Sequence, residues 1–391
     1  MTMPRPAHSH ALAKLKACVV LLVVLHHTIL AYCRDGYFDR TRYLWSSAPI
    51  VDRNRWIGFD LIVDFNDVYF MSLMFLLSGL FVLPSLARKG VRHYLRGRVL
   101  RLGLPFAVAV TLVMPIAYYP SYRQTGADIS LAQFWSGYFT AYGWSPGPAW
   151  FISLLLIFDA IAALVAQHWP ALTQKAATVP DWLIQYPRAG LGSFLAASCV
   201  AYLSMRFAFS PGYWLQFGPF AAQASRLLLY ATFFTTGAII GSAGTSHKLL
   251  QRTGPIAGTW AVWAGLALVA FAALVKLQLA DRQAMLSLTD PVWRILFGVL
   301  FVLTCVFTSL ALIGGFIRYL DTNRRWLDLL APCAFGIYLV HYALITWTQT
   351  ALLTLDISAI AKAVTVFAIT LLVCWSLIAF LRQNRVLRQI L

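Results

Sequence analysis

Long apolar stretches, separated by shorter polar segments, run through this chain from end to end. Windows long enough to cross the roughly 30 Å hydrocarbon core of a bilayer recur about ten times. We expect membrane spans near residues 17–33, 61–83, 102–119, 149–167, 191–208, 227–243, 256–275, 293–316, 329–351 and 363–381. Backbone polar groups must be satisfied internally in lipid, so this pattern predicts an all-α polytopic membrane protein, a bundle of about ten transmembrane helices. We expect a single transmembrane domain over residues 1–391.

Composition and charge agree with a membrane protein. Hydrophobic residues make up 60% of the chain and charged residues only 12%, more apolar surface than a soluble chain of 391 residues can bury. The net charge of +17 suggests an anionic partner such as nucleic acid, but topology explains it better. With a cytoplasmic N-terminus, nineteen of the 31 lysines and arginines fall in inner loops and tails. The positive-inside bias therefore predicts that both termini are cytoplasmic, and we expect no nucleic-acid partner.

Lys16 and His27, eleven residues apart, are the most informative polar residues of the first expected span. A histidine near the middle of a span is costly unless it is paired, so it indicates function. On a helical rise of about 1.5 Å per residue, His27 lies roughly 16 Å above Lys16, near the bilayer midplane. Asp67 in the second span and His341 in the ninth reach the same layer. A carboxylate beside an imidazole orients it and makes it more basic, which a general base for a hydroxyl needs.

Other polar residues at this depth have simpler interpretations. Asp159 and Arg206 have the character of structural partners between helices. His26 points about 100° away from His27 on a helix, so the two cannot face one partner, and His26 fits a hydrogen bond to a neighbouring helix. A metal held by the two deep histidines and the aspartate lacks an HxH or HExxH spacing, so we expect no metal.

A cationic run, residues 88–101, leads into the third expected span. On charge alone, a positive-inside stop that contacts lipid headgroups is the favoured explanation. The alternative is a phosphate clamp, because Arg98 and Arg101, like Arg92 and Arg96, recur at helical spacing. A ligand with several phosphates inside the cell and a long thin reactive arm would suit both this clamp and a deep histidine.

Five segments, in order along the chain, resemble motifs of the acyltransferase-3 family of membrane acyltransferases. The segment Lys16-x10-His27 resembles the family's basic-x10-His signature, and FLLSGLF at 75–81 is similar to its FFxxSGFF segment. The stretch from Tyr94 through Arg98 and Arg101 to Pro105 resembles YxxxRxxRxxxP. AWF at 149–151 is similar to LWFL, and FGIYLVH at 335–341 is similar to YGIYLLH. The resemblance covers most of the chain, with lysine in place of the commoner arginine at position 16 and a degenerate LWFL segment.

The resemblance implies an enzyme, an acyl-CoA-dependent O-acyltransferase. It implies transfer of an acetyl or succinyl group from cytoplasmic acyl-CoA, as donor substrate, to a hydroxyl of an extracytoplasmic glycan. The long, aspartate-bearing first outer loop, 34–60, looks closest to the branch that modifies periplasmic glucans. The family's essential histidine carries over to His27, and its paired arginines carry over to Arg98 and Arg101.

On this basis we expect CoA phosphates against Lys16, Arg98 and Arg101, with the pantetheine arm in a channel through the bundle. We expect His27 to deprotonate the acceptor, with Asp67 orienting the imidazole. The tetrahedral oxyanion would be stabilised by Tyr338 or His341, which follow in the ninth span.

Two other functions stay open. One is a transporter of an organic acid or sugar that uses the buried His and Asp residues as a proton relay. The other is a non-catalytic accessory protein of glycan assembly. In every case the lipid bilayer is a partner, and we expect the inner membrane of a bacterium. A homodimer is compatible with the sequence, which identifies neither the acyl group nor the glycan.

Overall fold

The computed structural model describes residues 8–141, 143–282, 289–321 and 325–391 of the chain. Nine helical segments in these ranges are long and apolar enough to cross a membrane, which confirms the all-α polytopic architecture. They are His10–Leu30, Ile57–Lys89, Val91–Gln124, Gly147–His168, Pro187–Ala208, Ala224–Ser242, Trp260–Asp281, Asp290–Tyr319 and Ala359–Leu381. Each contains or overlaps an expected span.

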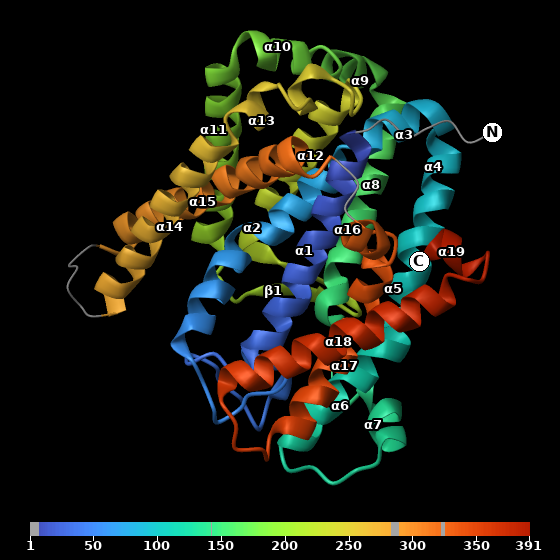
Figure 1. The fold of residues 1–391 in the computed structure, drawn as a ribbon, viewed down its shortest axis with the longest axis vertical. Coiled ribbons are helices and arrows are strands. Elements are labelled where there is room, and N and C mark those ends of the chain that lie inside the picture. Colours follow the sequence, from blue (N-terminus) through green and yellow to red (C-terminus); the bar gives the residue numbers. More distant parts are fainter. Residues whose placement is uncertain (1–7, 142, 283–288, 322–324) are drawn as a thin grey trace.

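The helices follow one another with short connections (Figure 1). The first half comprises α1 (His8–Leu30), α2 (Ile57–Gly79), α3 (Val82–Lys89), α4 (Val91–Arg98), α5 (Leu104–Val108), α6 (Met114–Gln124), α7 (Leu131–Tyr138), α8 (Trp150–His168), α9 (Pro170–Ala176) and α10 (Val179–Gln185). The second half comprises α11 (Pro187–Ala208), α12 (Leu227–Ser242), α13 (Pro255–Gly258), α14 (Trp260–Arg282), α15 (Asp290–Tyr319), α16 (Arg325–Leu330), α17 (Ala334–Leu352), α18 (Ala359–Leu381) and α19 (Leu387–Ile390). Between α11 and α12 lie strands β1 (Trp214–Phe217) and β2 (Phe220–Gln223).

The expected ninth span, 329–351, corresponds to α17, which is not among the nine apolar helices. His341, Thr346 and Gln349 interrupt its apolar sequence, and all three are buried. This helix packs against α1, α6 and α18 rather than standing alone in lipid. Its polar side chains therefore face protein, as expected for a helix that supplies a site.

The third expected span is longer than the sequence predicted. Residues 91–124 form one helical run that includes two π-helical turns, Val99–Gly103 and Ala109–Val113. The cationic segment is thus the first part of a helix that enters the bundle. Because a π-turn adds a residue to the helical repeat, it changes which side chains share a face.

The two ends of the bundle differ in character (Figure 1). One end carries residues 31–56, α7 and the segment before α8, and we call it the loop end. The opposite end carries α3, α9, α10 and α13, and we call it the basic end, because Arg88, Lys89 and Arg92 lie there. Helix α1 begins at the basic end and finishes at the loop end.

Small residues let α2 and α12 approach closely. A Cβ atom built on Gly237 would lie 2.1 Å from the carbonyl oxygen of Leu76, and one on Gly241 would lie 2.0 Å from that of Leu80. On the facing helix, Gly79 is equally close to the carbonyl oxygen of Phe234. Interfaces of this kind are typical of membrane helices, where small residues four apart allow backbone contact. The packing explains why glycine follows Ser78 in the second span.

The β-hairpin was not predicted from the sequence. Its strands pair antiparallel, with Trp214 opposite Gln223 and Phe217 opposite Phe220, across a turn at Gly218 (φ +56°). The strands are four residues each, too short to be distinguished by alternation from the apolar segments around them. The hairpin packs against α8, and the ring of Phe220 stacks on Phe106 with centroids 5.4 Å apart.

Candidate functional site

A cavity of about 1120 Å³ opens at the loop end of the bundle. Its wall comes from residues 41–47, two tyrosines of α6, the segment 143–150 and the region 210–221, which includes the hairpin. His27 from α1 and Tyr342 from α17 also border it. Hydroxyl, amide and backbone groups therefore surround a histidine that belongs to a membrane span.

The ring of His27 lies among aromatic rings of α17. Its centroid is 5.4 Å from that of His341 and 5.0 Å from that of Tyr342. Among the described residues, no hydrogen-bond partner reaches Nδ1 of His27 or Nε2 of His341, and both atoms are buried. The two deep histidines of the sequence are thus brought together, each with an unpaired ring nitrogen.

Gln349 fixes the backbone beneath the His27 ring. Its Nε2 donates to the carbonyl oxygen of Thr28 at 3.0 Å and to that of His27 at 3.3 Å. The last carbonyls of a helix have no intrahelical partner, so a buried amide from α17 satisfies them. This contact ties the end of α1 to the helix that carries His341.

Asp67 does not orient His27, which corrects the sequence-based expectation. Its carboxylate forms a short ion pair with the guanidinium of Arg226, which also donates to the Asp67 carbonyl oxygen. The charges of both groups act on His26, whose ring lies 5.1 Å from that of Phe70. As predicted, His26 and His27 face different neighbours. The spacing placed Asp67 at the right depth but could not reveal its partner Arg226, which directly precedes α12.

Tyr338, expected as a candidate oxyanion donor, has its hydroxyl engaged by the protein in this structure. Its hydroxyl donates a short hydrogen bond to the carbonyl oxygen of Pro148, at the start of the helical segment that leads into α8. His341 Nδ1 lies 2.7 Å from the carbonyl oxygen of Tyr338, so that nitrogen carries the proton. In the neutral ring Nε2 is then an acceptor. Both residues hold the site together, and His341 presents a lone pair rather than a proton.

Lys16, Arg98 and Asp159 meet beside the first half of α1. Arg98 Nε lies 3.0 Å from Asp159 Oδ2, and the Tyr94 hydroxyl donates to Asp159 Oδ1 at 2.5 Å. The charges of Arg98 and Asp159 act on Lys16, whose ammonium lies 4.4 Å from the ring centroid of Phe81. Asp159 therefore joins α8 to α4, as we expected of a structural partner between helices. Two cations share one buried carboxylate, which leaves an excess of positive charge.

Arg101 takes no part in this buried cluster. It lies in the first π-turn and is exposed, and its charge acts on Lys89 together with those of Arg88 and Arg98. Of the three expected phosphate ligands, Lys16 and Arg98 are thus together, whereas Arg101 borders them from the surface.

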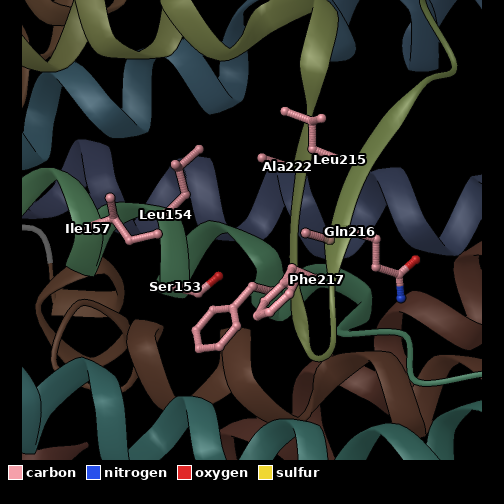
Figure 2. Close-up of a pocket in the computed structure, with 9 residues that line it drawn as sticks. Ser153, Leu154, Ile157, Leu215, Gln216, Phe217 and Ala222 are labelled. Carbon is pink, nitrogen blue, oxygen red and sulfur yellow. The ribbon is translucent and has the colours of Figure 1, made fainter.

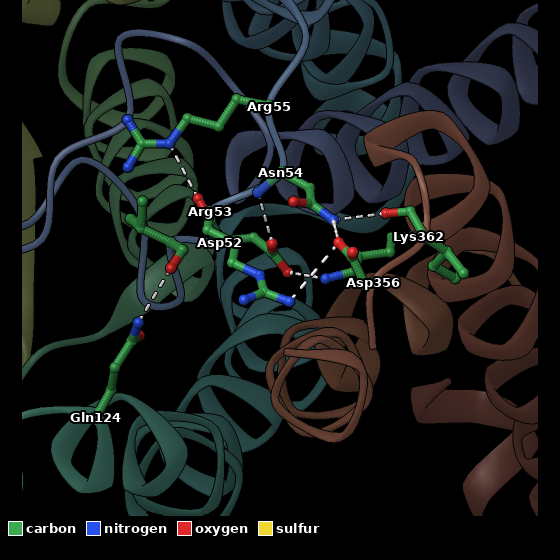
Figure 3. A network of polar contacts seen from close by, with 9 residues as sticks. Asp52, Arg53, Asn54, Arg55, Gln124, Asp356 and Lys362 are labelled. Atoms are coloured by element: carbon green, nitrogen blue, oxygen red, sulfur yellow. Dashed lines mark hydrogen bonds and ion pairs between the residues drawn. The ribbon is translucent and has the colours of Figure 1, made fainter. Parts of the chain in front are cut away.

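A buried ion pair fastens the first loop over the cavity. Lys362 Nζ lies 2.7 Å from Asp52 Oδ2, and both side chains are almost completely buried (Figure 3). Around it, Asn54 donates to the carbonyl oxygen of Ile357, and Gln124 donates to that of Val51. These contacts tie the loop to α18 and α6.

Asp39 shapes the part of this loop that lines the cavity. Its carboxylate accepts hydrogen bonds from the Thr41 hydroxyl at 2.7 Å and from the amides of Thr41 and Arg42. These contacts, the Thr41 hydroxyl foremost, hold the pKa of Asp39 below its ordinary value of 3.8. The turn therefore contributes stability above that pH and loses it as the pH falls through the lowered pKa.

The model of a protein family described as an acyltransferase domain matches residues 10–379. The chain belongs to the acyltransferase-3 family. It is therefore a multi-pass membrane acyltransferase, which confirms the resemblance drawn from its motifs. Searches of curated proteins and of solved structures found no match.

Within this acyltransferase, sequence reasoning missed the residues that complete the loop-end cavity. Ser145 donates to the hydroxyl of Tyr118, and Tyr138 donates to the carbonyl oxygen of Ser145. The dense tyrosines of residues 118–138 were the available signal, but tyrosine also marks membrane interfaces and could not be assigned to a site.

Arg206, which we expected to pair between helices, is buried, and its Nε has no hydrogen-bond partner among the described residues.

Proposed function

We propose that this acyltransferase moves an acyl group, acetyl or succinyl, from cytoplasmic acyl-CoA to a hydroxyl of an extracytoplasmic glycan, such as a periplasmic glucan. The bilayer is then the bacterial inner membrane, with the basic end facing the cytoplasm. One observation carries the proposal. A single helix, α1, holds His27 at a polar cavity of the loop end and Lys16 in a cationic cluster of the basic end, eleven residues away.

The cationic cluster suits the donor. CoA carries phosphates, and guanidinium and ammonium groups bind phosphate through charge-assisted hydrogen bonds. Lys16 and Arg98 outnumber the one carboxylate between them, and Arg101, Arg88 and Lys89 extend the positive surface. A rise of 1.5 Å per residue puts His27 roughly 16 Å from Lys16, a distance for a long thin arm to cross.

The cavity suits the acceptor. It is open at the loop end and offers the hydroxyls of Thr41, Ser46 and Ser47 and the rings of Tyr43 and Trp150. Hydroxyls and aromatic faces are the groups with which proteins bind sugars. The cavity is also large enough for more than one sugar unit.

The proposed chemistry follows from the position of His27 between the cationic cluster and the acceptor cavity. Its imidazole accepts the proton of the acceptor hydroxyl as the oxygen attacks the thioester carbonyl. The C–O bond forms, the C–S bond breaks, and the proton passes to the departing CoA sulfur. His341, whose Nδ1 proton is held by the Tyr338 carbonyl, keeps a lone pair on Nε2 and lies beside His27, with ring centroids 5.4 Å apart.

The test uses purified full-length protein in lipid nanodiscs and a panel of labelled acyl-CoAs. We expect loss of one thioester, with free CoA appearing at the rate at which label enters an added glucan. Thioester stability across the whole panel, with uptake of organic acid or sugar into proteoliposomes, would instead establish the transporter. If neither is seen, the accessory function gains support.

A further inference from the structure

The β-hairpin divides two cavities of opposite character. Successive side chains of a strand point to opposite faces, so β1 presents Trp214 and Gln216 to one side and Leu215 and Phe217 to the other. Figure 2 shows Leu215, Gln216 and Phe217. Trp214 and Gln216 line the polar cavity that contains His27. Leu215 and Phe217 line a second cavity of about 280 Å³ between the hairpin and α8.

The second cavity is an apolar groove. Apart from Ser153 and Gln216, its lining consists of carbon side chains, which include Phe220. Leu154 and Ile157 come from α8, and Phe217 and Ala222 come from the hairpin (Figure 2). Phe217 at the tip is 85% exposed. Such exposure of an aromatic ring is costly in water but not against hydrocarbon, so this side of the hairpin faces the membrane.

The groove leads onto a lipid-facing strip of α8. Ile157, Ile161 and Leu164 are exposed and recur at helical spacing on one face of this membrane helix. At its other end the groove meets the polar cavity, because Gln216 and Ala221 line both. Gln216 donates to the carbonyl oxygen of Trp144 at 2.6 Å and so closes the boundary with a satisfied polar group.

We infer that the groove binds the hydrocarbon chain of an amphiphilic acceptor, a glycoside whose sugar occupies the His27 cavity while its chain leaves sideways into the bilayer. This inference rests on the proposed function and narrows its acceptor to a membrane-anchored glycan. The groove adjoins the cavity that contains His27 and not the cationic cluster around Lys16 and Arg98. The occupant is therefore not a chain of the acyl-CoA donor.

Photolabelling tests binding without requiring acyl transfer. The probe is dodecyl glucoside with a diazirine near the end of its chain, added to the full-length protein in lipid nanodiscs. We expect label on the α8 and hairpin peptides that contain Ile157 and Phe217. Unlabelled dodecyl glucoside should compete roughly tenfold better than methyl glucoside, which lacks the chain, or dodecylphosphocholine, which lacks the sugar.

Equal competition by dodecylphosphocholine would overturn the inference, because the groove would then be ordinary lipid contact. Competition by dodecanoyl-CoA in preference to the glucoside would also overturn it and would assign the groove to the donor. Label elsewhere, or no label, would have the same consequence.

Filling the groove gives a second, independent readout. In Ala222→Trp, the new ring occupies the space opposite α8, and transfer to dodecyl glucoside should fall at least about tenfold while transfer to methyl glucoside is retained. Ile157→Trp does the same from the other wall. The matched control is Ala261→Trp, an exposed position on α14 away from the hairpin.

The two hypotheses fail in different ways. If the unmodified protein acylates neither glucoside, the proposed function loses support, whereas competitive labelling of the groove would still support an amphiphile site. If acyl transfer to methyl glucoside is as efficient as to dodecyl glucoside, and Ala222→Trp changes neither, the groove inference is wrong and the proposed function stands.

Discussion

At the scale of single residues, His26 and His27 show how adjacent histidines take different tasks. His27 borders the cavity and lies 5.4 Å, ring to ring, from His341. His26 turns toward Phe70 and toward the charges of Asp67 and Arg226. Only His27 is therefore placed to exchange a proton with a molecule in the cavity.

We expect His27→Ala to reduce acyl transfer by about 10²–10⁴-fold, the usual contribution of a positioned general base. The protein should still insert and still bind CoA, because Lys16 and Arg98 are untouched. His26→Ala is the matched control and should lose much less. The rates are compared at equal membrane abundance. Near-normal transfer by His27→Ala would remove the proposed mechanism, and equal losses in both variants would indicate helix packing.

Tyr338→Phe distinguishes a structural from a catalytic hydroxyl. Because the hydroxyl donates to the Pro148 carbonyl, which also accepts from the backbone amide of Trp150, its loss removes one buried hydrogen bond and should lower stability by about 0.5–1.5 kcal/mol. Thermal unfolding of the purified protein measures this. The kcat should stay within severalfold of the unmodified value, and a hundredfold fall in kcat without loss of stability would restore Tyr338 as an oxyanion donor.

The two arginines of the third span should respond differently to substitution. Arg101 is exposed, so Arg101→Ala should keep the fold and weaken CoA binding roughly tenfold, as expected for one charge-assisted contact. Arg98→Ala should also destabilise the protein, since it removes the guanidinium that lies 3.0 Å from the buried Asp159 carboxylate. CoA titration at low and high salt provides the measurement, because screening weakens exposed contacts most.

Arg252→Ala is the control for this pair, because it removes an exposed cation from the segment that precedes α13. Unchanged CoA affinity in Arg101→Ala would return that residue to contact with lipid headgroups.

At the scale of elements, the Asp52–Lys362 pair joins a loop to a membrane helix. Breaking a buried pair by removing one partner typically costs about 3–5 kcal/mol, whereas replacing both by apolar residues costs little. We therefore expect Asp52→Asn to destabilise the protein strongly and Asp52→Leu with Lys362→Met to recover most of the loss. Thermal unfolding and the acceptor KM are measured together, because the same loop lines the cavity.

Asp356→Asn serves as the comparison for this loop. It removes an exposed pair with Arg53, 3.6 Å long, which is worth at most about 1 kcal/mol. Equal destabilisation by Asp52→Asn and Asp356→Asn would show that the buried pair does not hold the loop.

Most membrane helices could be predicted from the sequence, because a membrane helix satisfies its own backbone hydrogen bonds and is recognisable as a long apolar run. The hairpin could not be predicted, because β1 and β2 are short and are recognisable as strands only from their pairing and their packing on α8. The depth of each polar residue also followed from the rise per residue. The partner of each polar residue did not follow. Asp67 pairs with Arg226, which directly precedes α12, and nothing in the spacing of α2 specifies which segment lies beside it.

At the scale of the whole molecule, the proposed chemistry depends on sidedness. The proposed donor cluster lies beside the first half of α1 and the acceptor cavity lies at its loop end, so acyl transfer across a membrane requires the basic end inside and the loop end outside. The distribution of lysine and arginine predicts this orientation, with both termini cytoplasmic. An inverted protein would present its cationic cluster to the wrong compartment.

Cysteine labelling in intact cells measures the orientation. In a background with the six native cysteines replaced, Tyr37→Cys places a thiol on the exposed first loop, and Arg92→Cys places one on the exposed face of α4. We expect a membrane-impermeant maleimide to label position 37 in intact cells and position 92 only after permeabilisation. Because both residues are exposed, a difference between them reports the side of the membrane and not burial. Labelling of position 92 in intact cells would contradict the topology, and with it a cytoplasmic donor, since the cluster around Lys16 and Arg98 lies at the same end of the bundle as α4.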